Sequence, residues 1–251
     1  MKACIYGAGA IGGWIGHGLA RAGCNVSVVA RGATLTALEQ HGLRLNQSGA
    51  VTSQPVQASA SPQALGIQDL VVISVKAPSL PEVAQQIAPL IGPNTMVLTA
   101  MNGVPWWFLQ GFGGAYAGQP LTSIDPQGAI ASAIAPQIKT LAGMVACDVV
   151  MPAAGHAHRA SGGQLYLERN SVTREMALLL NACGLATELA DDMRPVLWSK
   201  LLLQLNNPVN ALSDLPLRAQ LMDRDYRRVL AGLQHVLDAF VGIGLGYLSL
   251  D

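Results

Sequence analysis

The sequence predicts an α/β protein, with a doubly wound parallel sheet followed by an all-α C-terminal domain. Three observations lead to this fold class. Short apolar runs alternate with helix-like segments over residues 1–101, and a glycine-rich turn joins the first run to the first helix. From about Asp191 onward only helical apolar spacing remains. Strands that alternate with helices are typical of a parallel sheet with helices on both faces.

The first predicted unit is a strand, a helix and a second strand. Residues 3–6 form a short apolar run, and Trp14 and Leu19 then recur at helical spacing until Gly23 ends the helix. Residues 25–30 have the pattern of another buried strand. Together these segments form a unit of the ~30 residues that a βαβ motif needs.

The same alternation predicts the remaining elements of the sheet domain. We expect strands at 69–75 and 95–101, a decorating strand pair at 43–46 and 51–57, and antiparallel strands added to the edge of the sheet at 144–151 and 164–167. We expect helices at 33–41, 80–90 and 172–182, and a loop at 111–119.

The rest of the chain is predicted to be helical. Residues 195–205 and 223–241 both show helical apolar spacing, and a turn near Leu215 and Pro216 separates them. We therefore expect two domains, a sheet domain at 1–189 and a helical domain at 190–251.

Charge and hydropathy argue against several classes of partner. Fifteen basic residues balance fifteen acidic residues, so no overall field attracts nucleic acid or an anionic membrane. The most apolar stretch near the end, 239–250, is shorter than the ~20 residues of a membrane-spanning helix. The single lysine at the start runs directly into the first strand, which disfavours a secretory signal. We expect neither nucleic acid nor a membrane as partner.

The cysteines and histidines do not form a metal motif. Four cysteines, at positions 4, 24, 147 and 183, lack C-x-x-C spacing and are typical of reduced thiols in a cytoplasmic protein. His156 and His158 alternate on a predicted strand, but no nearby cysteine or acidic residue completes a ligand set. We therefore expect no metal, a structural or surface role for the two histidines, and a cytoplasmic location.

A glycine fingerprint lies between the first strand and the first helix: Gly7, Ala8, Gly9, Ala10, Ile11 and Gly12. Gly7 allows a tight turn, Gly9 lets the backbone approach a pyrophosphate, and Gly12 lets the helix pack close to the strand. The phosphates would accept hydrogen bonds from free amides at the positive end of the helix dipole. This context predicts a Rossmann-type dinucleotide site.

The residue after the second strand indicates which dinucleotide binds. Folds that prefer NAD usually place an acidic residue there for the ribose 2′-hydroxyl, whereas this chain places Arg31. A guanidinium attracts a 2′-phosphate through paired, charge-assisted hydrogen bonds, which favours NADP(H). The alternative is that Arg31 is an ordinary solvated arginine at a strand end.

Further candidates follow other strands or lie in the helical domain. Lys76 and Asn102 follow the strands at 69–75 and 95–101, where ligands of parallel sheets gather, although such residues are also common in turns. Lys200 and Gln204 are four residues apart and share a helix face, and Asn207 is expected near the same side one turn later. A buried polar stripe of this kind needs a polar partner, such as a ligand.

These motifs together resemble the ketopantoate reductase family, the 2-dehydropantoate 2-reductases. The similarity is carried in order by 7–12, Arg31, Val75-Lys76-Ala77, Asn102-Gly103 and Trp198-Ser199-Lys200-Leu201 with the downstream Asn207-Pro208. It implies an NADPH-dependent oxidoreductase that reduces a small 2-keto acid in pantothenate biosynthesis, and a possible homodimer. Gln204 stands where the family usually has asparagine. The chain ends at Asp251, before the family's last helices, so we expect the helical substrate and dimerisation domain to be partial.

The resemblance also implies the role of each site residue. Residues Gly7 to Gly12 would cradle the pyrophosphate and Arg31 the 2′-phosphate. Lys76 and Asn102 would contact the cofactor, and Asn102 the substrate as well. Lys200 matches the family's proton-donating lysine, while Gln204 and Asn207 fall near its substrate-binding amides. Two alternatives stay open: a related 2-keto or hydroxy acid dehydrogenase of other specificity, and a non-catalytic NADPH-binding protein.

Overall fold

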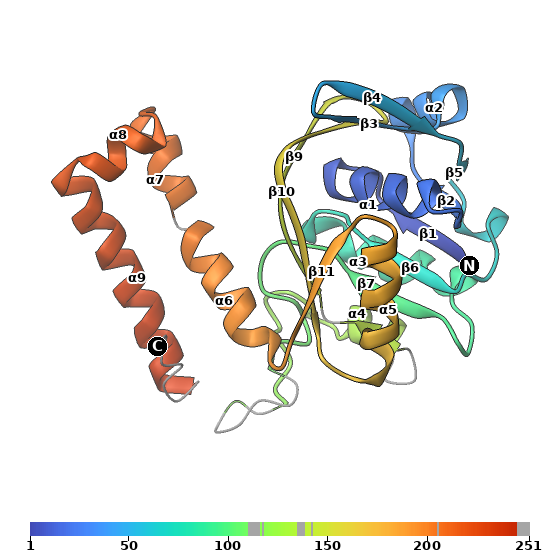
Figure 1. The fold of residues 1–251 in the computed structure, drawn as a ribbon. Coiled ribbons are helices and arrows are strands. Elements are labelled where there is room, and N and C mark those ends of the chain that lie inside the picture. The colour runs from blue at the N-terminus through green and yellow to red at the C-terminus, as the bar shows by residue number, and fades with distance from the viewer. Residues whose placement is uncertain (110–115, 117, 135–138, 142, 205, 245–251) are drawn as a thin grey trace. The chain divides into compact units, whose positions relative to one another are not determined.

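The computed structural model describes residues 1–109, 116, 118–134, 139–141, 143–204 and 206–244 (Figure 1). Contacts divide the chain into two compact units. The first consists of 1–102 and 122–193, and the second of 103–121 and 194–251. The first unit contains the described strands, and the described elements of the second unit are helices. This architecture confirms the predicted fold class.

A six-stranded sheet forms the centre of the first unit, and its strand order is β5-β2-β1-β6-β7-β8. The strands are β1 (Lys2–Tyr6), β2 (Asn25–Val29), β5 (Gln57–Ser59), β6 (Leu70–Ile73), β7 (Met96–Thr99) and β8 (Lys139–Leu141). All five neighbouring pairs are parallel. This is the strand order of the dinucleotide-binding Rossmann fold, in which the chain reverses direction across the sheet between β1 and β6.

The central strands are buried on both faces, which explains their largely apolar sequences. Every residue of β6 is buried, as are the last four residues of β1 and of β2. Strands of parallel sheets have this composition because helices or other layers cover both faces. The apolar runs thus predicted these strands correctly.

A second sheet in the same unit differs from the sequence prediction. Its order is β11-β10-β3-β4, and β9 pairs with β10 off this path. The strands are β3 (Leu43–Gln47), β4 (Ala50–Gln54), β9 (Gly143–Ala153), β10 (His156–Glu168) and β11 (Ala186–Ala190). The pairing of β9 with β10 is antiparallel as predicted, but their place at the edge of the first sheet was wrong, because β10 pairs in parallel with β3 and β11 instead. The predicted strand at 51–57 is two strands, of which β5 joins the first sheet.

Helix α1 (Ala10–Arg21) lies between the two sheets (Figure 1). Its glycines make this close packing possible. A Cβ built on Gly16 would lie 2.8 Å from Ile5 of β1 and 2.9 Å from Leu43 of β3, too close on both sides. A Cβ on Gly18 would likewise lie 2.9 Å from Leu185. The small residues of α1 therefore set the separation of the two sheets.

Four other α-helices are described in the first unit: α2 (Gly32–His41), α3 (Leu80–Gln86), α4 (Ala129–Ala133) and α5 (Ser171–Ala182). The predicted helix at 80–90 ends early, and 88–90 form a 3-10 turn. Pro89 explains this break, because its ring is incompatible with the interior of an α-helix. Two further 3-10 turns lie at Pro62–Ala64 and Ala77–Ser79.

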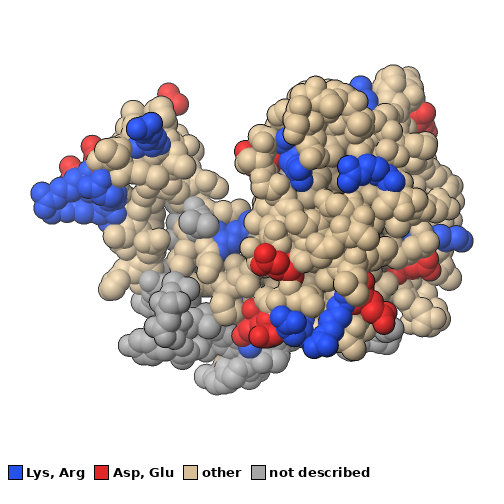
Figure 2. Space-filling model, viewed as in Figure 1, with Lys and Arg blue, Asp and Glu red and all other residues tan. Residues whose placement is uncertain are grey.

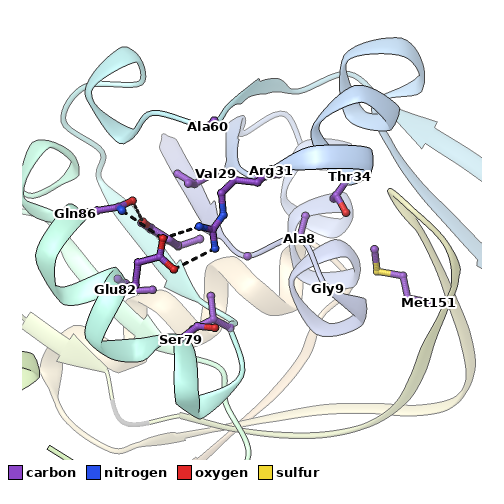
Figure 3. A pocket seen from close by; sticks show the side chains of 15 residues that line it. Ala8, Gly9, Val29, Arg31, Thr34, Ala60, Ser79, Glu82, Gln86 and Met151 are labelled. Carbon is purple, nitrogen blue, oxygen red and sulfur yellow. Dashed lines mark hydrogen bonds and ion pairs between the residues drawn. The ribbon is translucent and has the colours of Figure 1, made fainter.

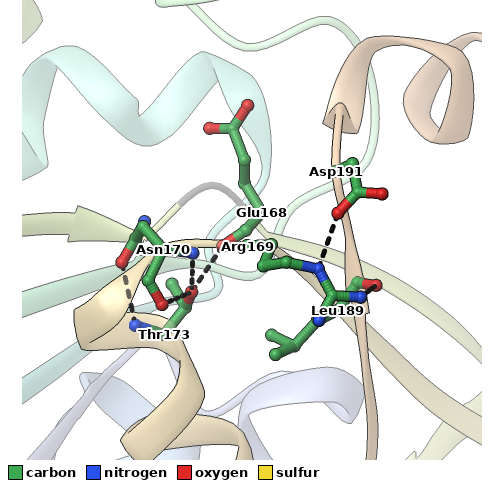
Figure 4. A network of polar contacts seen from close by, with 6 residues as sticks. All are labelled: Glu168, Arg169, Asn170, Thr173, Leu189 and Asp191. Atoms are coloured by element: carbon green, nitrogen blue, oxygen red, sulfur yellow. Dashed lines mark hydrogen bonds and ion pairs between the residues drawn. The ribbon is translucent and has the colours of Figure 1, made fainter.

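A capping box fixes the start of α5 (Figure 4). Asn170 Oδ1 accepts hydrogen bonds from the Val172 and Thr173 amides, both at 2.9 Å. The backbone amide of Asn170 in turn donates to Thr173 Oγ1 at 2.8 Å, and that hydroxyl donates to the Glu168 carbonyl. These bonds satisfy helix-end amides that have no partner within the helix.

The described helices of the second unit are α6 (Met193–Gln204), α7 (Asn206–Ser213), α8 (Leu217–Met222) and α9 (Arg224–Gly244). Helices α6 and α9 correspond to the two predicted segments, whereas α7 and α8 occupy the interval expected to contain a turn. Within this unit the ring centroids of Phe108 and Trp198 lie 6.3 Å apart, so the segment before residue 110 packs on α6. Buried Gln220 of α8 donates to the Val209 carbonyl of α7 at 3.1 Å.

On the face that Figure 2 shows, basic and acidic side chains are interspersed over the first unit. Among the described residues, no helix combines the length and apolar character needed to cross a membrane.

Candidate active site

The glycine turn between β1 and α1 has the geometry that its sequence requires. Gly7 has a φ of 96°, a left-handed conformation that residues with a Cβ rarely adopt. Its amide donates to the Val29 carbonyl of β2 at 3.2 Å, which ties the turn to the neighbouring strand. Gly7 therefore permits the sharp change of direction from β1 into α1.

Gly12 brings the helix against the turn. A Cβ at this position would lie under 3.0 Å from the Gly7 carbonyl oxygen, Ser74 Oγ and Ile5 Cγ2. Ser74 Oγ donates to the Gly7 carbonyl at 2.8 Å and so braces the turn from the end of β6. The glycine fingerprint in the sequence did not include Ser74. This residue could have been found from its place directly after β6, the strand beside β1.

Gly9 faces open space. A Cβ built there has no atom of the described residues within 4 Å, and the residue is exposed. Gly9 is also the N-cap of α1, and no described side chain caps this helix end. The first amides of a helix lack partners within the helix, so the open space in front of Gly9 is suited to an anionic group.

A cavity of about 300 Å³ adjoins this turn (Figure 3). Its walls come from the glycine turn, the carboxyl end of β2, and α3. The lining residues are Tyr6, Gly7, Ala8, Gly9, Val29, Ala30, Arg31, Thr34, Ala60, Val75, Ser79, Glu82, Val83, Gln86 and Met151. The structure therefore brings Arg31 together with Gly7, Ala8 and Gly9, at the position where the strand order reverses.

Arg31 forms an ion pair within the cavity wall. Its two terminal nitrogens donate to the two carboxylate oxygens of Glu82, at 2.6 and 3.1 Å. Gln86 Nε2 also donates to Glu82 Oε1 at 3.4 Å, and the Tyr6 hydroxyl donates to Gln86 Oε1 at 3.1 Å. Burial, and next the Glu82 carboxylate, raise the pKa of Tyr6, so this hydroxyl remains a donor.

The sequence analysis missed Glu82, Gln86 and Tyr6. The available signal was indirect: Glu82 lies in the first turn of the helix that follows β6, beside the switch point of the sheet.

The other cofactor candidates of the first unit do not line this cavity. Ala10, Ile11 and Gly12 form the first turn of α1 behind Gly9. Lys76 is exposed and precedes the 3-10 turn after β6, where its carbonyl accepts from the Ser79 amide at 2.9 Å. Asn102 is exposed and follows β7. Both Lys76 and Asn102 therefore follow carboxyl ends of strands, as expected.

The candidates in the second unit lie on two helices. Lys200 and Gln204 are both half-buried and one turn apart on α6. Asn207 is exposed on α7, and its place beside Lys200 and Gln204 stays a prediction.

The two histidines predicted to have a structural or surface role lie half-buried on β10. Within the described part of the chain, no group of three or more His, Cys, Asp or Glu side chains is placed to hold a metal ion. Burial raises the pKa of Cys4 and of Cys183 to about 11, so both thiols stay protonated.

The strand order, the glycine turn and the adjoining cavity define a dinucleotide-binding protein of the Rossmann type. Its relatives identify it as an NAD(P)H-dependent oxidoreductase. A family model described as ketopantoate reductase PanE/ApbA matches residues 3–106. A Mesorhizobium japonicum protein named 2-dehydropantoate 2-reductase is 40% identical over 253 residues, which cover 98% of this chain and 77% of that protein. This chain belongs to the ketopantoate reductase family.

Solved structures agree with this family. A candidate ketopantoate reductase of Ralstonia solanacearum MolK2 has a TM-score of 0.86 and 40% identity, over 91% of this chain and 72% of that chain. A PanE/ApbA family ketopantoate reductase of Ralstonia eutropha JMP134 has a TM-score of 0.81 and 28% identity, over 97% and 74% of the two chains. A D-mandelate dehydrogenase solved with NADH and anilino(oxo)acetate shares the fold at 20% identity, with a TM-score of 0.76.

Proposed function

We propose that this protein reduces 2-dehydropantoate (ketopantoate) to pantoate with NADPH, a step of pantothenate biosynthesis. Family membership and the 40% identical relative named 2-dehydropantoate 2-reductase support the reaction. The observation that supports the cofactor is that the glycine turn and Arg31 line the same cavity.

The residues of the cavity fit a dinucleotide. The space in front of Gly9 admits a phosphate against the α1 amides, and Arg31 adds a guanidinium to the same cavity. We assign the pyrophosphate to residues 7–12, the 2′-phosphate to Arg31, and further cofactor contacts to Lys76 and Asn102. When bound, NADPH supplies a hydride to the keto carbon of the substrate.

Lys200 is the proposed proton donor. Reduction of a ketone builds negative charge on its oxygen, which an ammonium group stabilises and then protonates. Asn102, Gln204 and Asn207 offer amide groups that can donate to the oxygens of a 2-keto acid and accept from its hydroxyl groups. These assignments rest on the match to the family motif. Three further expectations also remain predictions: a cytoplasmic location, a homodimer and a domain boundary at residue 189.

The test measures turnover and cofactor binding of the purified protein with a panel of 2-keto acids. We expect NADPH consumption with ketopantoate. Arg31→Ala should weaken NADPH binding about ten- to hundredfold and affect NADH binding much less, because the charge-assisted contact assigned to Arg31 in the cofactor is to the 2′-phosphate, which NADH lacks. The same change at exposed Arg174 of α5 is the matched control.

Lys200→Ala should lower kcat about 10²–10⁴-fold while NADPH binding stays the same. Undiminished turnover would remove Lys200 from the mechanism. Turnover of other keto acids in place of ketopantoate would identify a related dehydrogenase. Cofactor binding without turnover of any of these acids would identify a non-catalytic NADPH-binding protein.

A further inference from the structure

The cation assigned to the 2′-phosphate already has an anionic partner. Glu82 holds Arg31 through two hydrogen bonds, one from each terminal nitrogen of the guanidinium (Figure 3). Both side chains line the cavity, and they come from different elements, Arg31 from the end of β2 and Glu82 from α3. A 2′-phosphate that binds Arg31 therefore has to compete with a carboxylate.

The position of this carboxylate is fixed from two sides. Glu82 lies in the first turn of α3, and Gln86 lies four residues further along the same helix and donates to it. Gln86 is itself held by the hydroxyl of Tyr6, a buried residue at the end of β1. Because Gln86 donates to the carboxylate with its amide nitrogen and accepts from Tyr6 with its oxygen, the Glu82 side chain is anchored to the sheet.

A carboxylate held at this place should affect the binding affinities for NADPH and NADH in opposite directions. It repels the negative charges of a 2′-phosphate and neutralises the guanidinium that would bind them. It is also the group with which dinucleotide folds accept a hydrogen bond from the ribose 2′-hydroxyl of NAD, although that acid usually follows the second strand. Here the carboxylate is that of Glu82 on α3, which lines the same cavity as Arg31.

We propose that Glu82 is a cofactor-specificity residue that narrows the preference of this enzyme for NADPH over NADH. It holds Arg31 in a bidentate ion pair that a 2′-phosphate must open, and its carboxylate accepts a hydrogen bond from the 2′-hydroxyl of NADH. This inference rests on the proposed function, because it requires the 2′ position of the cofactor to lie beside Arg31.

The test replaces Glu82 with glutamine, which keeps the size of the side chain and removes its charge. Dissociation constants for NADPH and NADH are measured by titration of the intact protein. Glu82→Gln should tighten NADPH binding about two- to fivefold and weaken NADH binding to a similar extent. Glu175→Gln, which removes a carboxylate from an exposed site on α5, should change neither constant.

A second measurement isolates the 2′ position. Competition with 2′,5′-ADP and with 5′-AMP compares two ligands that lack the nicotinamide and differ only in the phosphate on the 2′ oxygen. Glu82→Gln should tighten binding of 2′,5′-ADP about two- to fivefold relative to binding of 5′-AMP. An unchanged ratio, or weaker binding of the 2′-phosphorylated ligand, would overturn the proposal and leave the ion pair a structural contact.

The two levels of inference fail in different ways. If the wild-type protein binds neither dinucleotide, or if Arg31→Ala leaves NADPH binding intact, the proposed function fails. If the wild type binds NADPH through Arg31 but Glu82→Gln does not shift the ratio, only the role of Glu82 fails. The thermal unfolding midpoint of each variant shows that the compared proteins are folded.

Discussion

Gly12→Ala is expected to destabilise the protein, whereas Gly9→Ala should weaken dinucleotide binding with little loss of stability. The Cβ added at position 12 would meet the Gly7 carbonyl oxygen, Ser74 Oγ and Ile5 Cγ2, all under 3.0 Å. Overpacking of a filled interior costs about 1–3 kcal/mol. Displacing the hydrogen bond from Ser74 to Gly7 costs about 1 kcal/mol more, and the higher helix propensity of alanine returns up to about 1 kcal/mol. The net loss should be about 1–4 kcal/mol.

Gly9 provides the contrasting case within the same fingerprint. Its φ of −72° and ψ of −168° are accessible to alanine, and no atom of the described residues lies within 4 Å of the added Cβ. Alanine is a poorer N-cap than glycine, so the free energy of unfolding should fall by no more than about 1 kcal/mol. The new methyl group would occupy the space proposed for the pyrophosphate, so affinity for NADPH should fall by at least about tenfold.

Urea unfolding and NADPH titration of both variants separate these effects. The expected pattern is a clearly lower urea midpoint for Gly12→Ala, and a midpoint near that of the wild type with weakened NADPH binding for Gly9→Ala. A Gly12→Ala protein as stable as the wild type would refute the packing argument. A Gly9→Ala protein that binds NADPH with wild-type affinity would refute the proposed path of the pyrophosphate.

Two further predictions concern stability. Asn170→Ala removes the acceptor of the α5 capping box and should lower the free energy of unfolding in urea by about 1–2 kcal/mol. Asn170→Ser should retain most of that stability, and equal losses in the two variants would contradict the capping role. Burial, and next Arg21, lower the pKa of His17 below its ordinary value of 6.5. The unfolded chain therefore takes up a proton below about pH 6.5 before the folded protein does, and stability should fall as the pH drops through this value. His17→Gln should flatten this loss between about pH 7.5 and 5.5, whereas an unaltered pH dependence would exclude His17 as its source.

Local sequence patterns predicted the four central strands of the parallel sheet, β1, β2, β6 and β7, because their buried residues are mostly apolar. They predicted the antiparallel pair β9–β10 but not its place, since the parallel pairing of 156–159 with 44–47 joins segments more than a hundred residues apart. The glycine turn was predictable because conformation and close packing both restrict its residues. The partner of Arg31 was not, because Glu82 lies 51 positions away and an exposed glutamate in a first helical turn has no distinctive pattern.

The position of α1 between two sheets has a consequence for ligand affinity. Its glycine-rich faces touch β1 on one side and β3 on the other, so the helix has no room to tilt. Its first turn therefore keeps its orientation before any ligand arrives. A preorganised turn loses little conformational entropy on binding, so more of the interaction with an anion is available as affinity.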